Sequence, residues 1–165
     1  MLEWYSNDEV GIFFNEIPRV CIRYVLPSSD KEEKKSIKKY PFINKKELKV
    51  KLIDYKKDKI YNFEIPKGYC FDGASIPRLF WRIIGPNTDN KFLIAALVHD
   101  TLCENHKYID YDRKFSSKVF NALLEFNDVC PFKRYLMKYS VDFYQKLFCK
   151  WNTNSGGKEK IYGQI

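Results

Sequence analysis

Four residues that could act together in hydrolysis lie within one mainly apolar stretch, residues 68–102. Asp72 and Ser75 belong to the run DGASIPR, and His99 and Asp100 follow inside the run LIAALVHDTL. In hydrolases a carboxylate orients a histidine, the histidine takes a proton as general base, and a serine hydroxyl can serve as nucleophile. Asp72, Ser75, His99 and Asp100 are therefore our candidate catalytic residues.

The same residues also have a structural interpretation. Asp72 or Ser75 would cap a helix that begins at Ile76. His99 would then be a core histidine whose ring nitrogens bond to a carbonyl or a carboxylate. Helix caps and hydrogen-bonded buried histidines are common in proteins, so we favour this interpretation over catalysis.

Alternation of apolar and charged residues with a period of two predicts the strands of the N-terminal half. Residues 48–54 and 59–65 alternate in this way, and the short link between them predicts a hairpin. Two further strands are expected at residues 10–16 and 20–26. The turn residues at 66–68 should end the sheet.

Helical patterns with capping signals fill the C-terminal half. The expected helices cover residues 76–84 and about 89–105, and two more begin after Asp112 and at Pro131. The predicted fold class is therefore α+β, with a small antiparallel sheet in the N-terminal half covered by about four helices from the C-terminal half.

A chain of 165 residues with 45% hydrophobic content is long enough for one domain with its own core. We expect a single α+β domain over residues 1–151, with a mobile charged excursion at about 27–47 and a flexible tail at 152–165. The sequence has no run of eighteen apolar residues, no signal-peptide pattern at its start, and five cysteines without a close pair. These features predict a cytoplasmic protein that makes no membrane contact and carries no cofactor or metal.

The spacing of residues along two of the expected helices predicts which side of each helix is buried. In the 89–105 helix, His99 shares the apolar face, whereas Asp100 lies about 100° away around the helix axis. Aromatic residues such as Tyr135 and Tyr139 could form a stacking surface for single-stranded nucleic acid, but their helical core spacing favours packing. The expected buried face of the last helix consists of Phe132, Tyr135, Leu136, Tyr139, Phe143 and Leu147.

The net charge of +8 is concentrated in two flanks of the chain. Residues 27–66 carry +5 from twelve basic and seven acidic side chains, and residues 131–165 carry +5 from seven basic and two acidic ones. Such flanks would attract nucleic acid or an acidic protein, although we favour a lysine-rich surface without a ligand because arginine is scarce. The candidate binding residues are Arg78, Trp81, Lys34, Lys35, Lys38, Lys39, Lys45 and Lys46.

The segment with the candidate catalytic residues resembles a known family. The pattern D-x-A-S-x-P-R-x-x-W at residues 72–81, followed by A-L-V-H-D-x-L at residues 96–102, is similar to the core of a domain of unknown function found mainly in bacteriophages and prophages. The resemblance implies a phage or prophage accessory protein. Ser117 stands where this family usually has an aspartate, which leaves few ligands for a divalent metal.

Together, the resemblance and the basic flanks favour a protein that acts by binding a host macromolecule. The expected partner is a host protein or a ribonucleoprotein, with a nucleic-acid-guided defence complex as the candidate target, or nucleic acid itself. Two alternatives stay open: a small hydrolase that uses His99 with Asp72 and Asp100, and a component of virion assembly.

Overall fold

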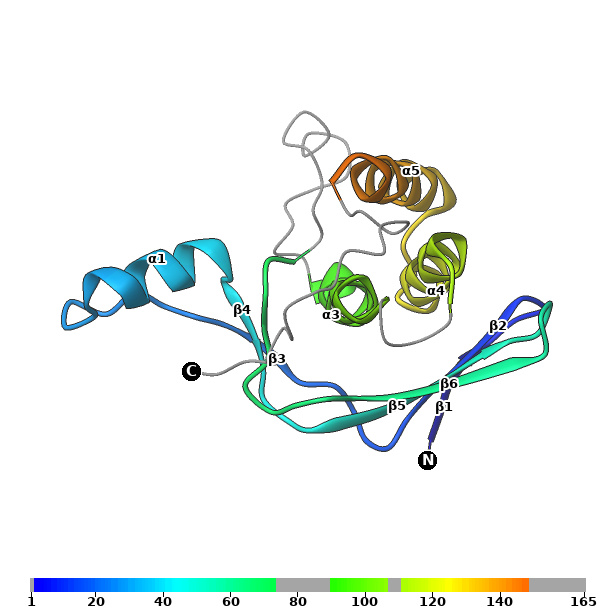
Figure 1. The fold of residues 1–165 in the computed structure, drawn as a ribbon, viewed down its shortest axis with the longest axis horizontal. Coiled ribbons are helices and arrows are strands. Elements are labelled where there is room, and N and C mark those ends of the chain that lie inside the picture. The colour runs from blue at the N-terminus through cyan, green and yellow to red at the C-terminus, as the bar shows by residue number, and fades with distance from the viewer. Residues whose placement is uncertain (1, 74–89, 107–110, 149–165) are drawn as a thin grey trace.

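The computed structural model describes residues 2–73, 90–106 and 111–148 of the chain (Figure 1). The described N-terminal residues form two antiparallel sheets, and the larger one has four strands in the order β1-β2-β5-β6. These strands are β1 (Leu2–Ser6), β2 (Val10–Phe14), β5 (Leu48–Asp54) and β6 (Lys59–Ile65).

The hairpin of β5 and β6 is the one that the alternating pattern predicts. It pairs Leu48 with Ile65 at one end and closes at Asp54. The Asp54 carboxylate accepts hydrogen bonds from two backbone N–H groups of the turn, at 3.1 and 3.3 Å. Asp58 completes the turn in the left-handed region, with φ of 51°, a conformation that aspartate tolerates better than most residues.

The smaller sheet contains β3 (Val20–Ile22), β4 (Phe42–Asn44) and β7 (Cys70–Phe71), in that order. The turn after β6 ends the larger sheet, as predicted. The chain then enters the smaller sheet as β7, which the sequence pattern did not indicate because β7 is only two residues long.

The charged range 27–47, where we expected only a mobile excursion, contains a helix, α1 (Lys31–Lys39), and strand β4. The Asp30 side chain caps α1 by accepting a hydrogen bond from the Glu33 N–H at 2.7 Å. Acidic residues occupy the first turn and lysines the last turn, an arrangement that complements the helix dipole. The lysine-rich composition concealed this helix because it offers a single buried apolar residue, Ile37.

Three predicted helices are confirmed: α3 (Asn90–Asn105), α4 (Arg113–Phe126) and α5 (Pro131–Phe148). The helix expected at 76–84, with Ser75 as its cap, lies outside the described residues. Helices α3 and α4 lie over one face of the larger sheet, and α5 lies beyond α4, farther from the sheet (Figure 1). The α+β prediction is therefore correct. No helix in the described ranges is both long and apolar enough to cross a membrane.

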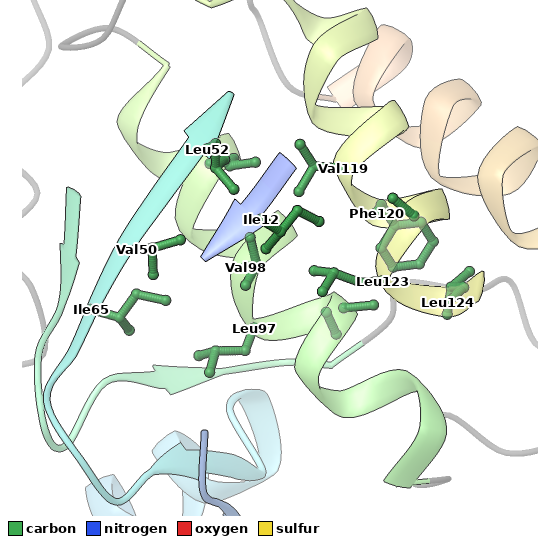
Figure 2. Close-up of a cluster of buried hydrophobic side chains, with 14 of the residues drawn as sticks. Ile12, Val50, Leu52, Ile65, Leu97, Val98, Val119, Phe120, Leu123 and Leu124 are labelled. Atoms are coloured by element: carbon green, nitrogen blue, oxygen red, sulfur yellow. The ribbon is translucent and has the colours of Figure 1, made fainter. Parts of the chain in front are cut away.

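The core lies between the larger sheet and helices α3 and α4, and Figure 2 shows how their side chains meet. Ile12 and Leu52 project from the sheet, Leu97 comes from α3, and Val119 and Leu123 come from α4. Each of these five side chains is completely buried. Because this packing joins elements from both halves of the chain, the sheet and the helices form one core.

The predicted buried face of α5 is wrong for its four aromatic residues, whereas Leu136, which was predicted on the same face, packs against the core. Phe132, Tyr135, Tyr139 and Phe143 are between 57% and 65% exposed. The helix instead packs against its neighbours with Met137, Ser140, Val141 and Gln145, which are all buried. The periodicity of the sequence showed that α5 has an aromatic face, but it did not show which face packs against the other helices.

Leu97→Ala tests the core. Leu97 has no exposed surface, so its truncation removes buried apolar contacts and leaves a cavity. We expect a loss of about 2–5 kcal/mol in the free energy of unfolding. Urea denaturation followed by circular dichroism measures it, and Ile60→Ala is the control because Ile60 is 57% exposed. A similar loss in both variants would contradict the assigned core.

Candidate functional site

A cavity of about 240 Å³ lies where the end of α1, strand β7 and helices α3 and α5 converge. Three of the candidate catalytic residues, Asp72, His99 and Asp100, line it, and so does the candidate binding residue Lys39. The structure therefore brings together residues that are up to about sixty positions apart in the sequence. Ser75, Arg78 and Trp81 lie outside the described residues.

Sequence reasoning did not single out Gln145, although its side chain contacts three other side chains at the site. Its side-chain nitrogen Nε2 lies within hydrogen-bonding range of His99 Nε2, and it is 3.1 Å from both Cys103 Sγ and Ser116 Oγ. Gln145 has no exposed surface. One buried amide thus joins α5 to α3 and α4. A single glutamine in an amphipathic helix gives no sequence signal for such a role.

The contacts of Ser116 determine the orientation of the Gln145 side-chain amide. The Ser116 hydroxyl donates its only proton to the backbone carbonyl of Arg113, at 2.9 Å. It can therefore only accept from Gln145, so the atom that faces it must be the amide nitrogen. The same nitrogen faces His99 Nε2, which must then act as an acceptor.

His99 is consequently a neutral ring with its proton on Nδ1. Burial lowers the pKa of His99 from 6.5 to about 3, because the charged form would lose its hydration. The Nδ1 atom lies 3.6 Å from Asp100 Oδ1, which is too long for a hydrogen bond. Phe120 packs against the ring with a centroid separation of 5.2 Å.

Asp72 lies on the exposed side of the same cavity. Among the described residues, the polar side chains nearest to the His99 ring nitrogens are Gln145, Cys103 and Asp100, and Asp72 does not bond to the ring. The arrangement in which Asp72 orients His99 as a base is therefore not present in the described contacts.

The part of the cavity near Tyr69 is acidic. The Tyr69 hydroxyl donates to Glu104 Oε2 at 2.9 Å. Burial, together with the charges of Asp100 and Glu104, raises the pKa of Tyr69 well above its usual value. Burial is the main cause of this shift, and the two nearby carboxylates add to it.

Ser117, at the position of the usual family aspartate, has a structural contact. Its hydroxyl donates to Asp142 Oδ1 of α5 at 3.1 Å, and Arg113 pairs with the same carboxylate. In the described part of the chain, no group of three or more histidine, cysteine or acidic side chains could hold a metal ion.

The candidate binding lysines occupy two places. Lys34, Lys35 and Lys38 are exposed on α1. Lys45 and Lys46 lie between β4 and β5, and Lys46 forms an ion pair with Glu16. The candidate binding lysines thus form two positively charged regions, one on helix α1 and one in the loop between β4 and β5.

A second surface lies on the outer side of α5. We define the α5 aromatic face as the exposed residues Phe132, Tyr135, Tyr139 and Phe143. The Tyr135 and Tyr139 rings stack with centroids 6.1 Å apart and planes inclined by 30°. Lys138 and Lys146 are exposed on the same helix, so flat apolar rings and positive charges lie close together.

A family described as "protein of unknown function (DUF1353)" matches residues 47–141, which is more than half of the chain. The chain belongs to this family. The matched range runs from the start of β5 to the middle of α5, so it includes the cavity residues of β7 and α3. It excludes α1 and Gln145.

The chain is also similar to an uncharacterised protein, y4jT, from Sinorhizobium fredii (strain NBRC 101917 / NGR234). The two are 34% identical over 80 residues, which is 48% of this chain and 23% of that protein. The chain thus corresponds to less than a quarter of its relative. No solved structure matches it.

The lowered pKa of His99 predicts a pH dependence of stability. Below pH 6.5 the unfolded chain protonates His99, while the folded chain does not until about pH 3. Stability should therefore fall with acid across this window, by about 1.4 kcal/mol per pH unit from this group. His99→Asn removes the group, so urea denaturation between pH 6.5 and 4 should show a shallower loss for the variant. Equal slopes would show that His99 is not held neutral.

Proposed function

We propose that this protein acts by binding, and that the α5 aromatic face binds single-stranded nucleic acid. The observation that carries this proposal is the exposure of Tyr135 and Tyr139 as a stacked pair, each about two-thirds exposed. A contiguous patch of exposed apolar rings is typical of a surface that meets a partner. Unpaired bases stack on such rings without regard to sequence, at about 1–3 kcal/mol per base.

Charge favours an anionic partner for this face. Helix α5 contains four basic residues and one acidic residue, and that acid, Asp142, already pairs with Arg113 of α4. Lys138 and Lys146 are exposed, so they can reach the phosphates of a strand whose bases stack on the rings. A purely apolar protein partner would have to desolvate these lysines, which is costly.

The hydrolase alternative has less support. A general base needs a free lone pair within reach of its substrate. The His99 Nε2 lone pair faces the Gln145 amide, and the His99 side chain is only 9% exposed. Catalysis through His99 would require α5 to release this contact.

The biological setting is part of the proposal. The resemblance to phage and prophage proteins supports an accessory protein that works in the cytoplasm of a host cell, with a host ribonucleoprotein or its nucleic acid as the partner. A nucleic-acid-guided defence complex combines both of these partners, and a role in virion assembly would instead require a protein partner for the α5 aromatic face.

Truncation of the stacked tyrosines tests this surface. Tyr135→Ala and Tyr139→Ala should each weaken binding of a fluorescent single-stranded oligonucleotide by about 5- to 150-fold, since each removes one stacking platform. Tyr24→Ala is the matched control, because Tyr24 is 74% exposed but lies outside α5. Fluorescence anisotropy at low salt measures the affinity. If the variants bind like the wild type, or if they only change the oligomeric state, the face has a different partner.

Salt dependence tests the lysines separately. Phosphate contacts release counterions, so the logarithm of the binding constant should fall linearly with the logarithm of the salt concentration. The double variant Lys138→Gln/Lys146→Gln should reduce the slope by about 1.4, which is about 0.7 for each lost contact with a single strand. Lys67→Gln, at an exposed turn position, should keep the wild-type slope. An unchanged slope in the double variant would remove these lysines from the binding surface.

A further inference from the structure

We propose that the cavity between α1, β7, α3 and α5 binds a small organic cation, an amine or a guanidinium group on a short apolar stem. The site differs from the α5 aromatic face in position, charge and ligand. The evidence consists of the charge of the lining, a buried acceptor and the aromatic walls.

The charged side chains of the lining are mostly acidic. Among the described lining residues, Asp72, Asp100 and Glu104 are acidic and Lys39 is basic. This acidic lining lies in a protein whose net charge is +8, so it is a local feature and does not reflect the composition of the chain. A cation that entered the cavity would move toward carboxylates from two separate elements, the end of β7 and helix α3.

Gln145 provides an independent indication of a ligand. It lines the cavity and is completely buried. Its nitrogen faces His99 and Ser116, whereas its oxygen Oε1 has no hydrogen-bond partner among the described residues. A buried carbonyl without a donor costs about 1–3 kcal/mol. An N–H group of a bound cation would remove this cost.

The walls are aromatic, which suits an organic cation better than a metal ion. Tyr40, Tyr69 and Phe71 line the cavity, and the rings of Tyr69 and Phe71 lie almost parallel, with centroids 6.3 Å apart. Aromatic faces attract ammonium and guanidinium groups and also pack against alkyl stems. The cavity volume of about 240 Å³ is below the roughly 300–1,000 Å³ of sites for drug-sized ligands, so the ligand is small.

Isothermal titration calorimetry of the full chain with n-butylguanidinium tests the proposal. Its neutral isostere, n-butylurea, has the same shape without the charge. We expect n-butylguanidinium to bind at least tenfold more tightly than n-butylurea. Equal affinities, or no binding of n-butylguanidinium, would overturn the proposal.

Variants locate the site. Asp72→Asn and Glu104→Gln should each weaken binding of n-butylguanidinium by about tenfold, whereas Asp8→Asn should leave it unchanged, since Asp8 is exposed and does not line the cavity. Circular dichroism confirms that each variant is folded, and Asp72→Asn keeps the test valid if Glu104→Gln unfolds, because Asp72 is exposed. An equal loss in Asp8→Asn would show that binding is non-specific.

A further arm identifies the source of the cation. If the tripeptide Gly-Arg-Gly binds more tightly than n-butylguanidinium, the natural ligand is a basic side chain of a partner; the reverse order indicates a free small molecule.

Discussion

The buried amide of Gln145 is the contact on which the rest of the site depends. It is the point where α5 meets both α3 and α4 through polar atoms, and its environment permits one orientation only, since Ser116 has no second proton to donate. That orientation makes His99 an acceptor and fixes its neutral tautomer. It also leaves the amide oxygen as an acceptor at the cavity. A buried polar network of this kind stabilises one arrangement of helices strongly, because any other arrangement leaves its members unpaired.

The same contact explains why α5 exposes its aromatic side chains. At 100° per residue, the positions of Met137, Val141 and Gln145 cluster on one side of the helix, and those of the α5 aromatic face are centred about opposite. Among the described elements, the neighbours of α5 lie on one side of this helix. Once the side with the amide packs inward, Tyr135 and Tyr139 must face solvent. Hydrophobicity alone would have placed the aromatic side inward.

The sequence predicted those parts of the fold that local chemistry determines. Alternation gave the β5–β6 hairpin, and Asp112, whose carboxylate accepts from the Phe115 N–H at 2.7 Å, gave the start of α4. The sequence-based prediction failed where the structure of an element depends on what the element packs against. Helix α1 is amphipathic around one apolar residue, and α5 has two faces that could pack. The candidate site could likewise be predicted only in part, because some of its residues come together only when distant elements pack. His99 is on a helix that is apolar on most sides, so its burial followed from the sequence, whereas Tyr69 and Gln145 join it only through the tertiary fold.

The two proposed binding surfaces are opposite sides of one helix. Val141 and Gln145 line the cavity, while Tyr135 and Tyr139 face outward from the same backbone. A helix moves as a unit on this length scale, so any displacement of α5 that widens the cavity also moves the α5 aromatic face. This geometry alone does not couple the two ligands, since a ligand shifts an equilibrium only by its difference in affinity between two states. The contact that could supply such a difference is the one between Gln145 and His99, because a cation that draws the Gln145 oxygen toward itself must change the geometry of the nitrogen on the same rigid amide.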